Sequence, residues 1–305
     1  MKGECMEITF DSLGPGMHLG IPFDDYLKIK AFSKSMVGEM EKSPAHCKYR
    51  KDQPITTKSL SLGSLVDCML LEPEEYAKTY IVAPATYINV KEEIKTWGYR
   101  AKYCVEWRDK QTGRGKTVIT AKERDEAKAI VAGITGDISK KLLSGTTQVT
   151  ALWFDPLHGV PCKARYDVLN DQDPADVNIT DLKTTSSPAT PESFKREMLK
   201  YKYHVQAAAY LESYEQIKGV EMKVFNFVVA ETTPPYLSQS FTIRPDSIML
   251  GQMQWERACG KYKECMDSGE WPGYPDTLIA IDVPAYALGP IETGFPEDII
   301  IEETK

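Results

Sequence analysis

Two aspartates and a lysine on neighbouring predicted strands are the residues of this chain best suited to chemistry. Asp181 and Lys183 lie two apart in the run 179–185, so a strand projects them from one face. Asp167 lies in a second predicted strand, 160–169, which the turn-forming segment 170–174 joins to 177–183. Two carboxylates and a lysine could bind a divalent metal and the water it activates. The alternative is that Asp181 and Lys183 form a surface ion pair.

A long predicted helix over residues 190–216 must border these strands. Thr190 is its N-cap, Pro191 occupies its first position and an acid follows in the first turn. Lys202, Gln206 and Tyr210 are spaced four apart and share one face of this helix. Because the helix begins just after residues 181–183, its polar face is expected beside the same site. Partly exposed surface residues are the alternative interpretation.

The order of elements along the rest of the chain predicts the fold class. Helices are expected at about 36–43, with Ser33 or Ser35 as N-cap, and at 59–71, 91–108, 120–134 and 247–268. Strands are expected between 148 and 183, at 224–230 and at 238–243. This order predicts an α/β fold, with a central mixed sheet flanked by helices and an N-terminal helical elaboration. We expect one domain over residues 1–290, with a catalytic core at about 145–275, and an acidic tail at 291–305.

Composition limits the compartment and the kinds of cofactor. The 305 residues are 42% hydrophobic and 27% charged, without a signal peptide or a membrane-spanning run, so a cytoplasmic protein with no membrane partner is expected. The seven cysteines include no Cys-x-x-Cys pair. Reduced, buried thiols are expected, and an iron–sulfur or zinc site built from distant cysteines is the alternative.

The negative charge is distributed unevenly. The net charge is −7, yet residues 91–116 hold eight basic and four acidic residues. Lys195, Arg196, Lys200 and Lys202 oppose only Glu197 in a second basic stretch. A basic patch on an acidic protein is compatible with a nucleic-acid partner, although such runs are usually solvated surface.

Several motifs together resemble a known family. Asp167, DLKTT at 181–185 and YHVQAAAY at 203–210 are similar to the core of the PD-(D/E)XK nucleases, which have a restriction-endonuclease-like fold. The closer resemblance is to the exonuclease VIII (RecE-like) branch of phages and prophages. It extends over roughly residues 25 to 275 and includes FSKS at 32–35, SPAH at 43–46, LGSLVDCMLLEP at 62–73, GKTVIT at 115–120 and WPGY at 271–274.

The resemblance implies a metal-dependent deoxyribonuclease that digests double-stranded DNA from 5′ to 3′ and leaves 3′ single strands for recombination. It further implies Mg²⁺ as cofactor, with Mn²⁺ also supporting activity, and a phage- or prophage-encoded protein in a bacterial cell. The expected partners are double-stranded DNA ends, further copies in a homo-oligomeric ring, such as a tetramer, and a single-strand annealing recombinase.

The resemblance also assigns roles within the expected site. Asp67, Asp167, Asp181 and the Leu182 carbonyl would hold the metal. Lys183, with a depressed pKa, would orient the attacking water or stabilise its charge. Gln206 and Tyr210 would position water or the scissile phosphate.

The family carries a metal-binding histidine where this sequence has Asp67. An aspartate can bind Mg²⁺ or Mn²⁺. Alternatively the ligand is lost and the enzyme impaired, or Glu72 substitutes.

Three further residues are candidates for contacts with DNA phosphates. Arg165 shares a strand face with Asp167, and its alternative role is a salt bridge to a neighbouring acid. Thr184 and Thr185 could donate to phosphate oxygens or simply end the strand.

Two other functions remain open from the sequence. One is another nuclease of this fold, an endonuclease or a single-strand-specific enzyme. The other is a catalytically impaired DNA-binding or assembly protein. A serine hydrolase or a P-loop enzyme is disfavoured, since neither Gly-x-Ser-x-Gly nor a Walker A motif is present.

Overall fold

The computed structural model describes residues 8–52, 62–98, 100–281 and 283. The chain divides into two compact units, Met1–Gly273 and Tyr274–Lys305. The described part of the second unit contains no helix or strand, and the predicted acidic tail at 291–305 lies outside the described residues. The candidate site belongs to the first unit.

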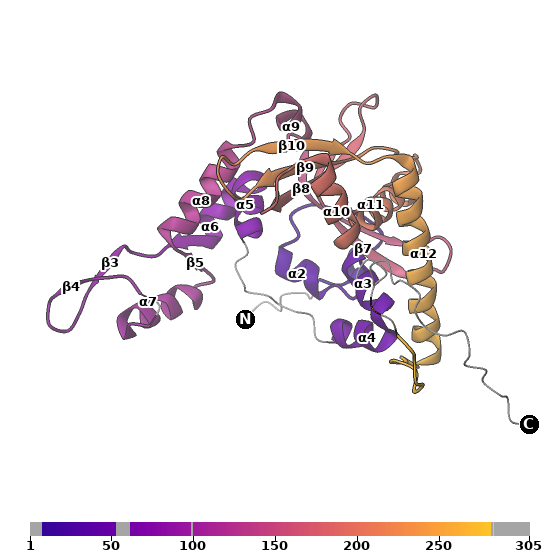
Figure 1. The fold of residues 1–305 in the computed structure, drawn as a ribbon, viewed down its shortest axis with the longest axis horizontal. Helices are drawn as coiled ribbons and strands as arrows, with labels where there is room; N and C mark the ends of the chain where they lie inside the picture. Colours follow the sequence, from indigo (N-terminus) through magenta and orange to yellow (C-terminus); the bar gives the residue numbers. More distant parts are fainter. Residues whose placement is uncertain (1–7, 53–61, 99, 282, 284–305) are drawn as a thin grey trace, which may run out of the picture. The chain divides into compact units, whose positions relative to one another are not determined.

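A six-stranded mixed sheet forms the centre of the first unit (Figure 1). Its strands, in spatial order, are β1 (Gly16–His18), β6 (Thr146–Phe154), β7 (Pro161–Asn170), β8 (Asn178–Thr185), β9 (Phe225–Glu231) and β10 (Ser238–Thr242). All neighbours are antiparallel except β8 and β9, which run parallel with Asp181 beside Phe227 and Lys183 beside Val229. The predicted central strands are therefore confirmed.

Helices cover both faces of this sheet. The helices of the described residues are α1 (Phe10–Leu13), α2 (Phe23–Lys28), α3 (Lys34–Lys42), α4 (Pro44–Asp52), α5 (Leu62–Leu71), α6 (Pro73–Thr79), α7 (Lys102–Thr112), α8 (Ala121–Ala132), α9 (Asp137–Leu142), α10 (Pro191–Lys200), α11 (Tyr203–Lys218) and α12 (Pro245–Ser268). One core places Val205 of α11 and Trp255 of α12 against the sheet, and a second places Leu65 of α5 and Ile130 of α8 against Leu182. Among the described residues, no helix has the length and apolar character needed to span a membrane.

The expected helix at 91–108 is wrong for residues 91–101 and confirmed for residues 102–108. Residues 86–88 and 94–96 instead form a hairpin, β3 (Thr86–Ile88) and β4 (Ile94–Thr96), and α7 begins only at Lys102. The Asn89 side chain accepts hydrogen bonds from the backbone N–H groups of Lys91 and Glu93, and Glu92 has a positive φ of 60°. This side-chain turn competes with a helix start and reverses the chain.

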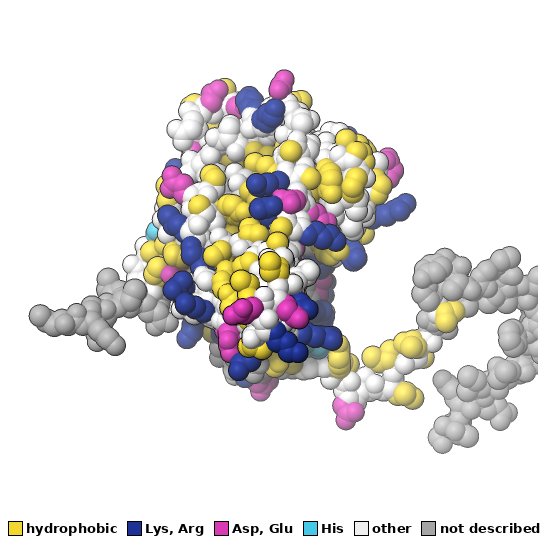
Figure 2. All heavy atoms as spheres, turned by 90° about the vertical axis from the view of Figure 1, so that its left-hand side faces the viewer, with side chains coloured by type: hydrophobic (Ala, Val, Ile, Leu, Met, Phe, Trp, Pro, Cys, Tyr) yellow, Lys and Arg dark blue, Asp and Glu magenta, His cyan; other side chains and the backbone are white. Residues whose placement is uncertain are grey.

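The hairpin and α7 belong to a lobe that also contains β2 (Tyr80–Val82) and β5 (Thr117–Ile119). These two strands form a short parallel pair. We call residues 80–119 the basic lobe, of which residue 99 is not described. Figure 2 shows the side of the molecule on which it lies, where Lys and Arg side chains flank a band of hydrophobic ones.

The single helix expected over 190–216 is also wrong, because it is broken into α10 and α11. Lys202 adopts the left-handed conformation, with φ 56°, as N-cap of α11. Its ammonium forms an ion pair with Glu41 at 2.7 Å. Gln206 and Tyr210 keep their shared helix face, but Lys202 is not part of it.

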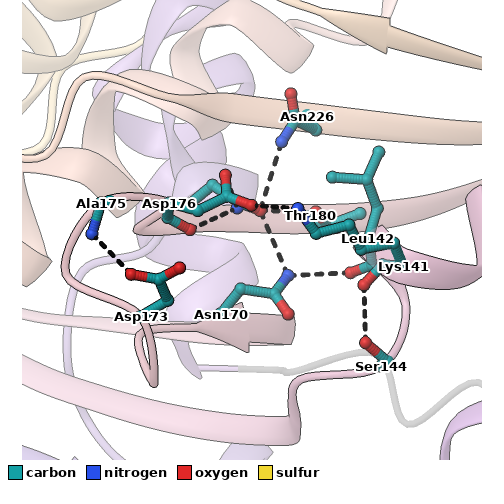
Figure 3. A network of polar contacts seen from close by, with 10 residues as sticks. Lys141, Leu142, Ser144, Asn170, Asp173, Ala175, Asp176, Thr180 and Asn226 are labelled. Atoms are coloured by element: carbon teal, nitrogen blue, oxygen red, sulfur yellow. Dashed lines mark hydrogen bonds and ion pairs between the residues drawn. The ribbon is translucent and has the colours of Figure 1, made fainter. Parts of the chain in front are cut away.

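An asparagine cluster fixes the register of β7, β8 and β9 at one end of the sheet (Figure 3). The Asn178 side-chain oxygen accepts hydrogen bonds from Asn170 at 3.1 Å, Thr180 at 3.1 Å and Asn226 at 3.2 Å. These bonds join three strands around one oxygen, so they oppose a slip of register. The alignment of Val168 with Thr180 then places Asp167 next to Asp181.

A buried acid joins α11, α12 and the sheet. Glu212, 7% exposed, accepts hydrogen bonds from the indole N–H groups of Trp153 and Trp255, both at 3.0 Å, and from Gln252 at 2.7 Å. Burial raises the pKa of its carboxyl group, while these three donors oppose the rise.

Replacing Glu212 by leucine is expected to lower the free energy of unfolding by about 2–4 kcal/mol, because two buried indole donors lose their acceptor. Glu212→Gln keeps an acceptor oxygen and should lose clearly less. Urea denaturation of both variants measures the difference, with the exposed Glu215→Leu on the same helix as control. Equal losses for leucine and glutamine would contradict the acceptor role.

Candidate active site

Asp167 lies where the β7–β8 ladder ends. Backbone pairing stops at Val168 and Thr180, and beyond it the backbone N–H of Leu182 donates to Asp167 Oδ2 at 2.8 Å. On the other side of β7, Gln148 of β6 stands at the position opposite Asp167 and has a positive φ of 55°. The side-chain alternation changes at this point, because Tyr166 belongs to the α11 core and Val168 to the α5 core. Asp167 is thus turned towards β8 at a kink in the sheet.

Asp181 is the most buried acid of the site, at 2% exposure. Its Oδ1 accepts a hydrogen bond from the Gln206 amide of α11, and its Oδ2 forms an ion pair with the Lys183 ammonium. Among the described residues, Oδ2 has no partner other than this ammonium. The strand geometry expected from the sequence, with Asp181 and Lys183 projecting together, is therefore present.

Lys183 is held charged. Burial alone would lower the pKa of its ammonium, but the neighbouring Asp181 and Asp167 outweigh burial and raise it. Both carboxylates stabilise the ammonium in the protein without metal, and the depressed pKa expected beside bound metal stays a prediction. The ammonium also lies 4.8 Å from the ring centre of Tyr203. A lysine in this state can orient or stabilise negative charge but does not accept a proton.

Asp67 joins the two strand aspartates from α5. Burial, together with the charges of Asp181 and Glu72, raises its pKa from 3.8 to about 7, although Lys183 opposes the shift. Burial and the charges of Asp181 and Asp67 likewise raise the pKa of Asp167. Three carboxylates therefore lie within electrostatic reach of one another with one lysine among them, which leaves an excess of negative charge.

The donor chemistry of this cluster fits a divalent cation such as Mg²⁺. Carboxylate oxygens are its preferred ligands, and among the described residues the Oδ2 atom of Asp181 has only the Lys183 ammonium as a partner. As the side chains stand, no group of three or more His, Cys, Asp or Glu among the described residues is placed to hold a metal ion. The Lys183 ammonium lies against Asp181 and the Leu182 amide holds Asp167. Joint ligation would therefore require these carboxylates to turn towards one another.

Tyr210 completes the α11 side of the site. Burial raises the pKa of its phenol, with Tyr26 and the two strand aspartates adding to the rise, whereas a hydrogen bond with the Arg165 backbone opposes it. The phenol therefore stays protonated at neutral pH. Tyr210 and Gln206 both face the strand carboxylates, as their spacing predicted.

The remaining predicted residues have other partners in the structure. Leu182 buries its side chain in the α5 core. Arg165 is 9% exposed and donates to Gln148 at 2.5 Å and to the Ile21 carbonyl at 2.6 Å. Its guanidinium also lies 3.6 Å from Glu72, the acid considered as a substitute metal ligand. The guanidinium thus links Gln148, Ile21 and Glu72. A contact of Arg165 with a DNA phosphate stays a prediction.

The two threonines at the end of β8 differ. The Thr185 hydroxyl donates to Glu197 of α10 at 2.6 Å and accepts from the Ser187 amide at 3.0 Å. Thr184 is half-buried. Their predicted phosphate contacts stay untested, and the proton of the Thr185 hydroxyl is already committed to Glu197.

Lys34 and Tyr203 lie beside the site, although the sequence patterns predicted no role for either. Lys34 donates to the Tyr201 carbonyl at 2.7 Å and lies 5.3 Å from the Tyr203 ring, which Lys183 also contacts. Burial, and after it the charge of Lys183, lowers the pKa of Lys34 to about 8. Lys34 lies in the motif at 32–35 and Tyr203 in the motif at 203–210. The periodicity of the local sequence does not predict a contact between residues 34 and 203, which are far apart in the chain.

Comparison with known proteins gives a family match and a match to a solved structure. A family model described as a PDDEXK-like domain of unknown function (DUF3799) matches residues 29–280. No curated protein matches the sequence. Among solved structures, a crystal structure of a "putative exonuclease" from Eubacterium rectale matches with a TM-score of 0.48 and 13% identity, covering 86% of this chain and 93% of that chain.

Proposed function

Because the chain belongs to the family of PDDEXK-like domains called DUF3799, and its mixed sheet flanked by helices is the corresponding α/β fold, we propose that it is a metal-dependent deoxyribonuclease. The observation that carries the proposal is the site itself. Asp167 and Asp181 lie on adjacent strands, Lys183 lies against Asp181, and Gln206 donates to the same carboxylate. This arrangement suits phosphodiester hydrolysis.

Asp67, Asp167, Asp181 and the Leu182 carbonyl would hold one or two Mg²⁺ or Mn²⁺ ions. The metal, when bound, supplies an activated water and neutralises charge on the phosphate. Lys183, whose ammonium lies against Asp181, would stabilise negative charge at the attacking oxygen. Gln206 fixes the orientation of Asp181, and the protonated Tyr210 can donate to water or to a phosphate oxygen.

The basic lobe supports DNA as the substrate. Six of its basic residues are exposed: Lys91, Lys95, Arg100, Lys102, Lys110 and Arg114. Lys91, Arg100, Lys110 and Arg114 form no ion pair with a described residue, so their charge is available to a polyanion.

Within this proposal the finer assignment is a 5′-to-3′ exonuclease acting on double-stranded ends. Its support is the resemblance of the motifs to the RecE-like branch. The same resemblance is the ground for a homo-oligomeric ring such as a tetramer, for a single-strand annealing recombinase partner, and for phage or prophage origin in a bacterial cytoplasm.

Digestion of end-labelled linear duplex DNA tests the proposal. We expect nucleotide release with Mg²⁺ and none with EDTA, loss of a 5′ label before a 3′ label, and no cutting of covalently closed circular DNA. Cutting of the closed circle would indicate an endonuclease, and digestion of single strands alone would indicate a single-strand-specific enzyme. DNA retention without any product in Mg²⁺ or Mn²⁺ would indicate the impaired DNA-binding protein.

The contribution of Asp67 to the stability of the protein without metal is expected to fall as pH rises from about 4 to about 7. A carboxyl group whose folded pKa is raised, such as Asp67 at about 7, keeps a proton that the unfolded chain releases, so folding is opposed at higher pH. Mg²⁺ binds the deprotonated form and should raise Tm more at pH 8 than at about pH 5.5.

Thermal unfolding of the wild type, Asp67→Asn and the exposed loop variant Asp173→Asn measures this effect. Asp67→Asn should flatten the pH dependence and reduce the rise in Tm with Mg²⁺, and Asp173→Asn should change neither. If Tm of Asp67→Asn depended on pH and Mg²⁺ as that of the wild type does, the assignment of Asp67 to the metal site would be contradicted.

A further inference from the structure

A polar cavity of about 310 Å³ lies beyond the end of β8. Its lining includes Ser186, Ser187, Ser193, Arg196, Glu197 and Lys200. Hydroxyl groups and two cations therefore dominate its wall. None of these residues has a role in the site described above, apart from the hydrogen bond of Glu197 with Thr185.

The two cations of the cavity are available to a ligand. Arg196 and Lys200 are four residues apart on α10, which places them on one helix face. Both are exposed, and neither forms an ion pair with a described residue. The Lys200 ammonium lies 4.9 Å from the ring of Tyr201. The single acid of the wall, Glu197, is engaged by the Thr185 hydroxyl at 2.6 Å.

The cavity is attached firmly to the catalytic strand. Ser186 follows Lys183 by three residues, a distance of about 10 Å along an extended chain. Thr185 links the end of β8 both to Glu197 of α10 and to the Ser187 amide. The cations on α10 are thus held at a fixed distance from Asp181 and Lys183.

We propose that this cavity binds a phosphate of the DNA strand that is cut, within about three nucleotides of the scissile phosphate. The estimate divides the roughly 10 Å of extended chain between Lys183 and Ser186 of the cavity wall by a rise of about 3.4 Å per nucleotide along the DNA axis. Guanidinium and ammonium groups are the usual ligands of phosphate, and serine hydroxyls add neutral donors. The inference rests on the proposed nuclease function. A released mononucleotide carries the same phosphate chemistry and is the other source of the ligand.

DNA binding in a Lys183→Ala background tests the inference, because the duplex then stays intact. Adding Arg196→Gln and Lys200→Gln together should weaken binding of a linear duplex at least about tenfold. The slope of log K against log salt concentration should become less steep by about one to two. Lys195→Gln is the matched control, since this exposed lysine lies on the same helix but outside the cavity wall.

Two further measurements separate the outcomes. Inhibition of wild-type digestion by dAMP, lost in the double variant while duplex affinity is kept, would assign the cavity to the phosphate of the product. Equal duplex affinity and equal dAMP inhibition in the double variant and in Lys195→Gln would overturn the phosphate site. In that case wild-type digestion of DNA would still support the nuclease function, whereas absence of digestion in the wild type would contradict the function itself.

Discussion

Replacement of Asp181 by asparagine is expected to reduce metal-dependent DNA digestion by about 10³-fold or more. Asparagine keeps an oxygen that accepts from Gln206, but the negative charge that faces Lys183 and the metal is lost. Because the packing is unchanged, the loss should appear as a lower kcat and a higher Mg²⁺ requirement. Single-turnover digestion over a range of Mg²⁺ concentrations measures both.

Stability provides the control for Asp181→Asn. Removing one of three neighbouring carboxylates relieves repulsion with Asp67 and Asp167, whereas the ion pair with Lys183 is lost. The two effects oppose each other, so the free energy of unfolding should change by less than about 1 kcal/mol. The loop variant Asp173→Asn should leave both activity and stability unaltered. Digestion at the wild-type rate by Asp181→Asn would eliminate the proposed site.

Replacement of Lys183 by glutamine is expected to lower kcat about 10²–10³-fold with little change in duplex affinity. The ammonium lies between the strand carboxylates and the Tyr203 ring, where a neutral amide cannot stabilise a developing negative charge. In the protein without metal, the two strand carboxylates raise the pKa of this ammonium. Single-turnover rates and fluorescence anisotropy with a labelled duplex separate catalysis from binding.

Lys218→Gln is the matched control for Lys183. Lys218 also forms a lysine–aspartate ion pair, with Asp171 at 3.6 Å, but at the far end of α11. This variant should digest DNA at the wild-type rate. Equal losses in the two variants would mean that a general decrease in positive charge, and not the position of Lys183, determines the rate.

The sheet and the part of the site that lies on its strands could be predicted, because local sequence patterns determine both. Apolar alternation and the turn at 170–174 identify β7 and β8, and their adjacency brings Asp167 beside Asp181. The capping box of α8 is equally local: Thr120 and Glu123 exchange hydrogen bonds as their spacing predicts.

Features that depend on a single unusual side chain or on distant contacts could not be predicted. The hairpin at 86–96 depends on the Asn89 side chain, which no apolar period reveals. The break before α11 depends on a left-handed Lys202, a conformation that is rare for lysine. Its ion pair partner, Glu41, is remote in sequence. The sign of the Lys183 pKa shift needed the actual distances to two carboxylates, because burial and charge act in opposite directions.

The point at which the β7–β8 ladder ends has a consequence for amide hydrogen exchange. Amides at 168–170 and 178–180 are closed in by paired strands and by the asparagine cluster, so they should exchange only on global unfolding. The Leu182 amide depends instead on one carboxylate oxygen of Asp167. Its exchange should therefore be faster than that of the paired amides and should respond to whatever binds that carboxylate. A single amide signal would then report occupancy of the site without any substrate.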